Sequence, residues 1–189
     1  MKIITWKVKK HYILAALLAI CMIGYVAVYP SAASAAAKER PLPVYCVDKD
    51  QKICSISFDA AWGNEDTQTL IDILGKYNVK ATFFVVGDWV DKYPESVKAL
   101  ANAGNEVMSH SNHHDHYNSL STEQIQADLK ACSDKIQAVT GVCPTLIRCP
   151  YGEYDNHVIT CIRCCGMEPI QWDVEPSARA ATNWGAEVL

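Results

Sequence analysis

The sequence predicts an α/β domain, built as a parallel sheet or an α/β barrel, behind an N-terminal export segment. Short apolar runs that suit buried strands alternate with segments whose apolar residues recur at helical spacing. Polar residues directly follow several of these strands, where parallel α/β folds collect their functional sites. The chain of 189 residues suits one domain, since domains of about 100 to 200 residues are usual.

Residues 1–30 have the pattern of a signal peptide or a membrane anchor. Several lysines precede residues 12–29, which carry no charge, and small residues follow them. This apolar stretch is longer than that of a typical cleaved signal and approaches the ~20 residues that span a bilayer. We therefore expect contact with the cytoplasmic membrane through residues 12–29, a linker over residues 31–44, and an extracytoplasmic domain, anchored or secreted, over residues 45–189.

The composition argues against some partners and sites. The net charge is −4 and no basic stripe follows the N-terminal lysines, so we expect no nucleic-acid partner. The expected domain contains eight of the nine cysteines, and an exported setting makes these residues disulfide candidates. Cys161 and Cys164 form a C-x-x-C pair, but no second pair accompanies them, so structural or free thiols are favoured over a zinc or redox site. Nothing in the sequence indicates an oligomeric state.

The first half of the domain alternates three strands with two helices. ICSISF (53–58), KATFFVV (80–86) and NEVMS (105–109) are short apolar runs that suit buried strands. TLIDILGKY (69–77) spaces its leucines and isoleucines as a helix does, and a further helix begins at Pro94, because proline is favoured at the first helical position.

The second half continues the alternation. Ser121 and Gln124 form a capping-box pair that begins a long helix. TLIRC (145–149) is a fourth strand, residues 154–165 have helical spacing, and EPIQWDV (168–174) is a fifth strand.

Polar groups follow four of the five expected strands. They are Asp59 after the first, the histidine-rich loop Ser109–Ser121 after the third, Arg148 at the end of the fourth, and Asp173 with Glu175 after the fifth. Because the loops after parallel strands converge at one edge of a sheet, this arrangement predicts an active site there.

The histidine-rich loop holds four histidines within seven residues. The H-x-x-x-H spacing of His110 and His114 predicts a helical turn with both imidazoles on one side, where a divalent metal can bridge them. His113 and His116 are interpreted as polar loop surface.

Asp59 is the carboxylate expected beside these imidazoles, since a hydrolytic zinc takes three protein ligands and a water. Beside a metal-bound water it can instead act as the general base, and in isolation it is a helix cap or a solvated charge. Arg148, in the tight turn IRCPYG, can pair with Asp59 and orient it, or form a plain surface ion pair.

The motifs SFDAAWG, HSNHH, RCPYG and QWDVE follow one another within about residues 50–184 and resemble those of the polysaccharide deacetylase family, carbohydrate esterase family four. HSNHH fits the family's H-[ST]-x-x-H, and RCPYG fits its R-x-P-[YF]-G. The resemblance implies a distorted (β/α) barrel that hydrolyses N-acetyl groups of peptidoglycan or chitin-like glycans. FDAAWG is similar to a subgroup associated with sporulation and cell-wall maturation.

The resemblance also implies roles for single residues. Asp59 matches the catalytic base, Arg148 the residue that orients it, and Tyr151 the residue whose backbone N–H stabilises the oxyanion. His110 and His114 match the ligands of a divalent metal, with zinc expected. The residues expected to contact the glycan are Trp62, Pro150, Trp172 and Asp173, with Glu175 beside them.

Two departures from the family qualify this expectation. Ala60 occupies the position of a metal-binding aspartate, for which Asn64, Glu65 or Asp66 are candidate substitutes. The family's final leucine-x-histidine motif does not occur before Leu189, so we expect a barrel that is incomplete at the C-terminus. The alternative function is therefore a catalytically impaired or metal-free glycan-binding relative.

Overall fold

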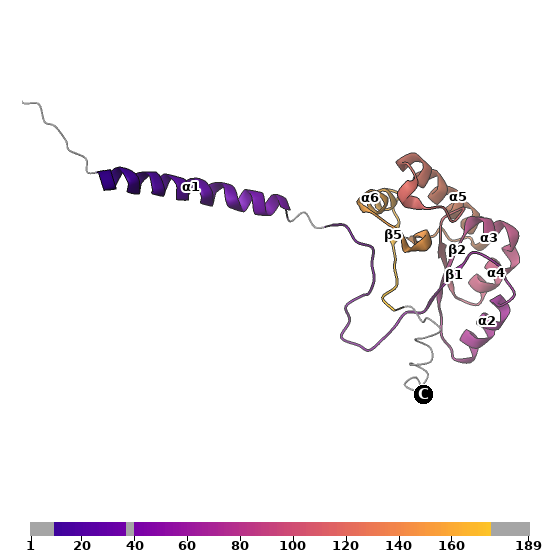
Figure 1. Ribbon diagram of the computed structural model, residues 1–189. Helices are drawn as coiled ribbons and strands as arrows, with labels where there is room; N and C mark the ends of the chain where they lie inside the picture. Colours follow the sequence, from indigo (N-terminus) through magenta and orange to yellow (C-terminus); the bar gives the residue numbers. More distant parts are fainter. Residues whose placement is uncertain (1–9, 37–39, 175–189) are drawn as a thin grey trace, which may run out of the picture. The chain divides into compact units, whose positions relative to one another are not determined.

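The computed structural model describes residues 10–36 and 40–174 and divides the chain into two compact units (Figure 1). The first, Met1–Arg40, contains helix α1 (Lys10–Ala36), which includes residues 31–36 of the expected linker. Over the part of the chain described with its side chains, no helix is both long and apolar enough to cross a membrane. The membrane contact expected over residues 12–29 stays a prediction.

The second unit, Pro41–Leu189, alternates strands with helices. Its strands are β1 (Ser57–Ala60), β2 (Thr82–Val85), β3 (Glu106–Ser109), β4 (Leu146–Ile147) and β5 (Glu168–Pro169). Its helices are α2 (Thr67–Lys76), α3 (Gly87–Lys92), α4 (Pro94–Asn102), α5 (Thr122–Thr140) and α6 (Asn156–Cys164), with 3-10 turns η1 (Tyr117–Ser119) and η2 (Pro150–Gly152).

The five strands lie side by side in sequence order and every pair is parallel. Val44 adds a single bridge to Ile170 beyond β5. Within the described residues β1 and β5 do not pair, so the sheet is open between them. The parallel α/β class is therefore confirmed, and the incompleteness of the barrel at the C-terminus stays a prediction.

Two elements differ from the expectation. The first strand was expected over residues 53–58, but pairing with β2 begins at Ser57 opposite Thr82, and Ile53 is exposed. Of the preceding residues, Ile56 accepts from the Thr82 N–H of β2 over 3.1 Å, so the strand begins about three residues later than expected. Helix α3 was not expected, because its six residues are too few to display a helical period.

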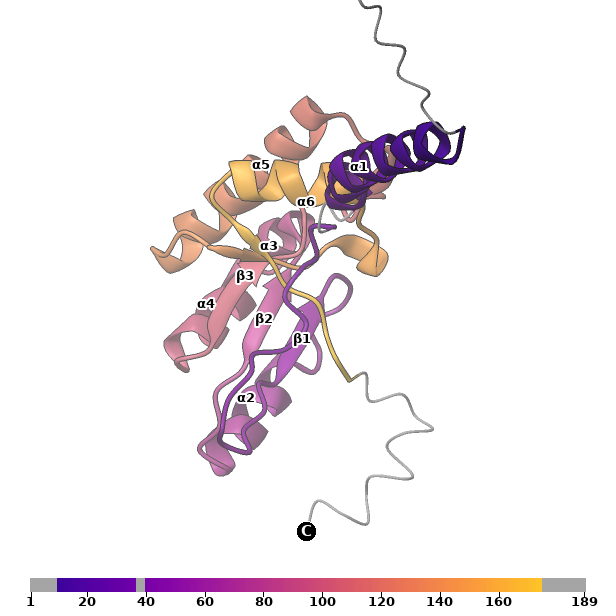
Figure 2. The ribbon, with the colours of Figure 1, turned by 90° about the vertical axis from the view of Figure 1, so that its left-hand side faces the viewer.

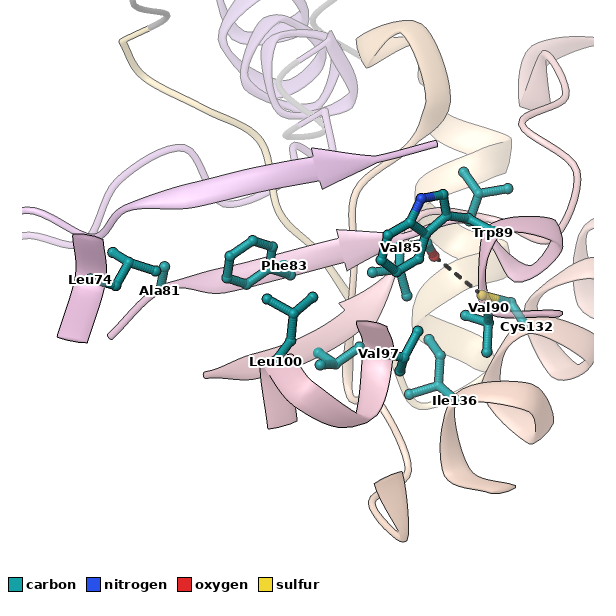
Figure 3. Packing of buried hydrophobic residues seen from close by; sticks show 12 residues of the cluster. Leu74, Ala81, Phe83, Val85, Trp89, Val90, Val97, Leu100, Cys132 and Ile136 are labelled. Carbon is teal, nitrogen blue, oxygen red and sulfur yellow. Dashed lines mark hydrogen bonds between the residues drawn. The ribbon is translucent and has the colours of Figure 1, made fainter. Parts of the chain in front are cut away.

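The main apolar core lies between the sheet and helices α2 to α5, which gather on one side of the strands (Figures 1 and 2). Phe83 and Val85 of β2 face this core and pack with Leu100 of α4 and Ile136 of α5 (Figure 3). Cys132 of α5 contributes its thiol, which donates to the Val85 carbonyl over 3.6 Å. Burying one such aliphatic side chain stabilises the fold by about 1.5–3 kcal/mol.

The opposite face of the sheet carries the polar residues. Successive strand residues point to opposite faces, so Phe58 of β1 and Phe83 of β2 pack in the core while their neighbours Asp59 and Phe84 point away from it. Arg148 follows the core residue Ile147 and points the same way as Asp59, to which it bonds. We call this side the interior face of the sheet.

Candidate active site

Arg148 joins the ends of β1 and β4 across the interior face. Its side chain is buried, and its Nη1 donates to Asp59 Oδ1 over 2.7 Å while its Nη2 donates to Ser57 Oγ over 2.8 Å. The guanidinium also lies 4.2 Å from the centre of the Phe84 ring, a cation–π contact. These contacts hold the Asp59 carboxylate in one orientation. No pattern in the sequence indicated the bond to Ser57.

His110 lies beside this pair and is only 4 % exposed. Its Nδ1 donates to the Arg148 backbone carbonyl over 2.8 Å, since a carbonyl oxygen only accepts. Its Nε2 therefore keeps a lone pair, and it lies 4.0 Å from Asp59 Oδ2. Burial lowers the pKa of His110, against the opposing effect of Asp59, so the ring is neutral at pH 7.

His114 places a second neutral ring next to the first. The two ring centres are 5.0 Å apart, and the rings meet edge to face. Burial lowers the pKa of His114 as well. Its Nδ1 is buried and has no hydrogen-bond partner among the described residues. The pair therefore offers imidazole nitrogens to a ligand or a metal.

An irregular loop, not the expected helical turn, brings the two rings together. Ser111 and His114 have φ of 70° and 61°, in the left-handed region that costs residues other than glycine free energy. The Ser111 hydroxyl accepts from the His114 N–H over 2.9 Å. Asp128 of α5 accepts from the Asn112 N–H over 2.8 Å and from the Tyr117 hydroxyl. The expectation was wrong because these long-range bonds, rather than helical spacing, fix the loop.

Tyr151 forms the outer wall of the site and has φ 58° within η2. Its ring centre lies 4.6 Å from that of His114. The ring also stacks on His116, at 4.0 Å between ring centres and 10° between ring planes, and His116 Nδ1 bonds to Glu153 Oε2 over 3.0 Å. His116 thus supports Tyr151, a contact that the interpretation as loop surface missed.

His113 fits that interpretation as loop surface. Its ring is exposed, and its Nδ1 lies 2.9 Å from Asp88 Oδ2. The bond to Asp88 raises the pKa of His113.

A hollow of about 230 Å³ opens between these side chains. It is lined by Asp59, Ala61, Trp62, His110, His114, Cys149, Tyr151, Gly152 and Trp172. Gly152 has φ 66°, and a Cβ there would lie 3.0 Å from the Trp172 ring, so glycine lets Trp172 approach. Ala61, Cys149 and Gly152 were not expected at the site from the sequence.

Some expected residues lie elsewhere. Pro150 is buried within η2 and Asp173 is exposed, and neither lines the hollow. Glu175 lies outside the described residues. Arg148 does not line the hollow and bonds Asp59, which does.

The donors for a metal are fewer than the sequence suggested. None of the candidate substitutes for the family's aspartate lines the hollow, and Asn64 donates instead to Ser96 Oγ over 2.9 Å. Ala60 packs against the apolar core. Among the described residues no group of three or more histidine, cysteine, aspartate or glutamate side chains is placed to hold a metal. Because a catalytic zinc takes three protein ligands, the two imidazoles do not complete such a site.

All nine cysteines are free thiols, so none of the disulfide candidates is paired. Burial raises the pKa of Cys132 to about 11 and that of Cys149 to about 12. These two thiols therefore stay protonated at neutral pH and behave as apolar packing groups.

The comparison with known proteins identifies relatives over the same region. The profile of the polysaccharide deacetylase family matches residues 47–170. The uncharacterized protein YlxY of Bacillus subtilis is 32% identical over 136 residues, which are 72% of this chain and 43% of that protein. Peptidoglycan-N-acetylmuramic acid deacetylase PdaC of Bacillus subtilis is 35% identical over 130 residues, which are 69% of this chain and 27% of that protein. The chain thus spans less than half the length of these two relatives.

Solved structures share the fold. A wild-type CE4 family pseudoenzyme from Bacillus anthracis has a TM-score of 0.69 and 29% identity, and the match covers 77% of this chain and 50% of that one. A mutant of that pseudoenzyme with restored enzymatic activity has the same TM-score, 0.69, at 31% identity, over 77% of this chain and 52% of the mutant. Since the family profile matches more than half of the sequence, the chain belongs to the polysaccharide deacetylase family.

Proposed function

We propose that this domain hydrolyses N-acetyl groups of a cell-wall glycan, either peptidoglycan or a chitin-like polymer. The observation that carries the proposal is the placement of Asp59, whose carboxylate is held by Arg148 and lines a hollow beside two neutral imidazoles. The family supports the reaction class, and the likeness to a peptidoglycan deacetylase supports the substrate class.

In this proposal Asp59 is the general base. Arg148 occupies Oδ1, which leaves Oδ2 to accept a proton from the attacking water. The water adds to the acetamide carbonyl, the C–N bond breaks as the leaving nitrogen takes the proton from Asp59 Oδ2, and the products are acetate and the free amine. The backbone N–H of Tyr151 stabilises the oxyanion. Trp62 and Trp172, which both line the hollow, contact the sugar.

The expected zinc would find only His110 and His114 as protein ligands among the described residues. A bound divalent metal supplies polarisation of a carbonyl and activation of water, and it normally needs a third protein ligand to do so. The steps assigned above therefore use the chain's own residues.

A second function, glycan binding without hydrolysis, is favoured by this incomplete donor set. Ala60 lacks the carboxylate that the family's aspartate carries at this position, while Trp62 and Trp172 still line the hollow. The likeness to a CE4 family pseudoenzyme supports this alternative.

We also propose that the domain acts outside the cytoplasmic membrane. Residues 1–30 would serve as signal peptide or anchor, residues 31–44 as linker, and residues 45–189 as the deacetylase domain. The lysines before an uncharged apolar stretch support this assignment. A role in sporulation stays a prediction from the sequence.

The proposal is tested by acetate release from N-acetylglucosamine oligomers and from peptidoglycan. We expect Asp59→Asn to lower the rate by about 10²–10⁴-fold with an unchanged circular dichroism spectrum, because the general base is lost. Asp134→Asn, at an exposed carboxylate on α5 that pairs with Lys130 outside the hollow, is the matched control and should leave the rate unchanged. Full activity of Asp59→Asn would remove Asp59 from the mechanism. Glycan binding by a wild-type chain that releases no acetate would favour the second function.

A further inference from the structure

Asp128 of α5 is a buried carboxylate that the proposed reaction does not use. The residue is 8% exposed and does not line the hollow. Its Oδ1 accepts two hydrogen bonds, while its Oδ2 is buried and has no hydrogen-bond partner among the residues that the structure describes. Burying a carboxylate costs free energy unless its bonds offset that cost, so the two bonds at Oδ1 must account for this residue.

Both bonds run to the histidine-rich loop, on either side of His114. The Asn112 N–H donates to Asp128 Oδ1 over 2.8 Å, and the Tyr117 hydroxyl donates to the same oxygen. Asn112 precedes His114 in the loop and Tyr117 follows it. One carboxylate oxygen therefore closes the loop around His114.

The backbone, rather than a bond to the ring, sets the place of His114. His110 is held by its own ring, because its Nδ1 donates to the Arg148 carbonyl over 2.8 Å. The His114 Nδ1 is buried and has no hydrogen-bond partner in the described part of the chain. His114 also has φ 61°, a left-handed conformation that persists only where the surrounding structure enforces it. The His114 ring therefore depends on the bonds that close the loop.

Helix α3 holds the start of the same loop. The N–H groups of its first two residues donate to the carbonyls of Ser111 and Asn112, each over 3.0 Å. Asp128 connects this anchored start to Tyr117, which is fully buried. Without Asp128 the two ends of the loop would lose their shared anchor, and the backbone at His114 could relax.

A displaced His114 would disturb the site through its ring contacts. Its ring centre lies 4.6 Å from that of Tyr151 and 5.0 Å from that of His110. Tyr151 carries the backbone N–H assigned to the oxyanion. Because a displacement of about 1 Å can lower a rate about 10²-fold, a change at Asp128 can reach the reaction without a contact to the substrate.

We propose that Asp128 is a positioning residue, which fixes His114 at the wall of the hollow through its bonds to Asn112 and Tyr117. The consequence for acetate release rests on the proposed function. The consequence for the place of the His114 ring does not.

The first test compares Asp128→Leu with Asp128→Asn in the full chain. Asp128→Leu removes both acceptor bonds, whereas Asp128→Asn keeps a carbonyl oxygen that can accept them. We expect Asp128→Leu to lower kcat for acetate release from N-acetylglucosamine oligomers by about 10²-fold. KM should change less, because stabilisation of the oxyanion develops only as the water adds. Asp128→Asn should lose less than about tenfold in kcat, since its bonds are weaker but still present.

Ile136→Ala is the matched control for lost stability. Ile136 lies on the same helix, is fully buried in the main core and does not line the hollow. Its truncation destabilises the fold by leaving a cavity, without removing a bond to the histidine loop. We expect kcat to stay within about twofold of that of the natural chain, because distant sites act independently. All rates are measured at a temperature at which circular dichroism shows every variant folded.

A second readout does not depend on hydrolysis. The ring-proton signals of His114 in nuclear magnetic resonance report where its ring lies against the ring of Tyr151, because aromatic rings shift the signals of nearby protons. We expect Asp128→Leu to move these signals and Ile136→Ala to leave them in place. His157 on α6 provides the reference signal.

An unchanged kcat in Asp128→Leu, or an equal loss in Ile136→Ala, would overturn the positioning role. His114 signals that stay in place in Asp128→Leu would overturn it too. If the natural chain releases no acetate and Asp128→Leu still moves the His114 signals, the positioning of His114 is supported and the proposed hydrolysis is contradicted. Should Asp128→Leu fail to fold, Tyr117→Phe removes one of the two bonds, and an unchanged kcat with unmoved His114 signals there would overturn the proposal.

Discussion

The histidines of one loop have two different surroundings. The inner histidines, His110 and His114, lie on the interior face, and burial lowers the pKa of both. The outer histidines, His113 and His116, are exposed, and each bonds a carboxylate of another segment. The surroundings that the fold provides therefore decide whether a histidine of this loop is a buried, neutral ring or an exposed ring bonded to a carboxylate. Sequence spacing alone does not separate the two kinds.

The largest difference between the inner and outer groups should appear in stability. Arg148→Met removes the buried guanidinium that donates to Asp59 and Ser57, and we expect the free energy of unfolding to fall by about 1.5–3 kcal/mol, the range for hydrogen bonds to a charged group. Lys135, which bonds Asp91 over 2.7 Å near the outer histidines, is the matched control. Lys135→Met should cost less than about 1 kcal/mol, since its carboxylate partners are exposed. Urea denaturation measures both, and equal losses would mean that the inner network is no more tightly held than the outer one.

The next largest effect is expected in the affinity of the inner histidines for Zn²⁺. Ala60→Asp adds a carboxylate next to Asp59, and we expect Zn²⁺ affinity to rise at least about tenfold as the ligand set grows from two to three. Calorimetry on the variant and the natural chain measures this change. Ala138→Asp, at an exposed position on α5 away from the hollow, is the control. An unchanged affinity in Ala60→Asp would show that the new carboxylate stays on the core side of β1, where Ala60 packs now.

His116 tests whether an outer histidine acts on the site. His116→Ala removes the ring stacked on Tyr151, and we expect a loss of about 0.5–1.5 kcal/mol in unfolding free energy together with slower acetate release. His116→Phe keeps a stacking ring but loses the bond to Glu153, so it should restore most of both properties. If His116→Ala matches the unsubstituted chain in stability and rate, Tyr151 needs no such support.

The smallest effect is expected at His113. Its bond to Asp88 raises its pKa, so the pair stabilises the fold fully below the unfolded pKa of about 6.5, and this contribution is lost as pH rises through the folded pKa. Because both side chains are more than half exposed, the contribution should stay below about 1 kcal/mol. His113→Gln should therefore destabilise the protein at pH 5.5 and have little effect at pH 8.5. A loss that is larger at pH 8.5 would contradict the assignment, and His157→Gln on α6 serves as the control.

Local patterns predicted much of this fold. The Ser121 and Gln124 capping box begins α5 as expected, because its bonds lie within one turn. The prediction that Asp59 and the histidine loop meet where parallel strands end also holds, since Asp59 and His110 line one hollow. The bonds from Asp128 to the histidine loop join residues whose partnership leaves no mark on local spacing. The irregular loop was therefore beyond prediction from the sequence.

The contrast between inner and outer histidines is tested most directly by a calorimetric titration with Zn²⁺. Three full-length chains are compared: the natural chain, His110→Ala with His114→Ala, and His113→Ala with His116→Ala. The account predicts weak Zn²⁺ binding that is lost in His110→Ala with His114→Ala and kept in His113→Ala with His116→Ala. This result would identify the inner histidines as the zinc ligands. Binding that survives in the inner variant, or disappears in the outer variant while circular dichroism shows an intact fold, would contradict that assignment.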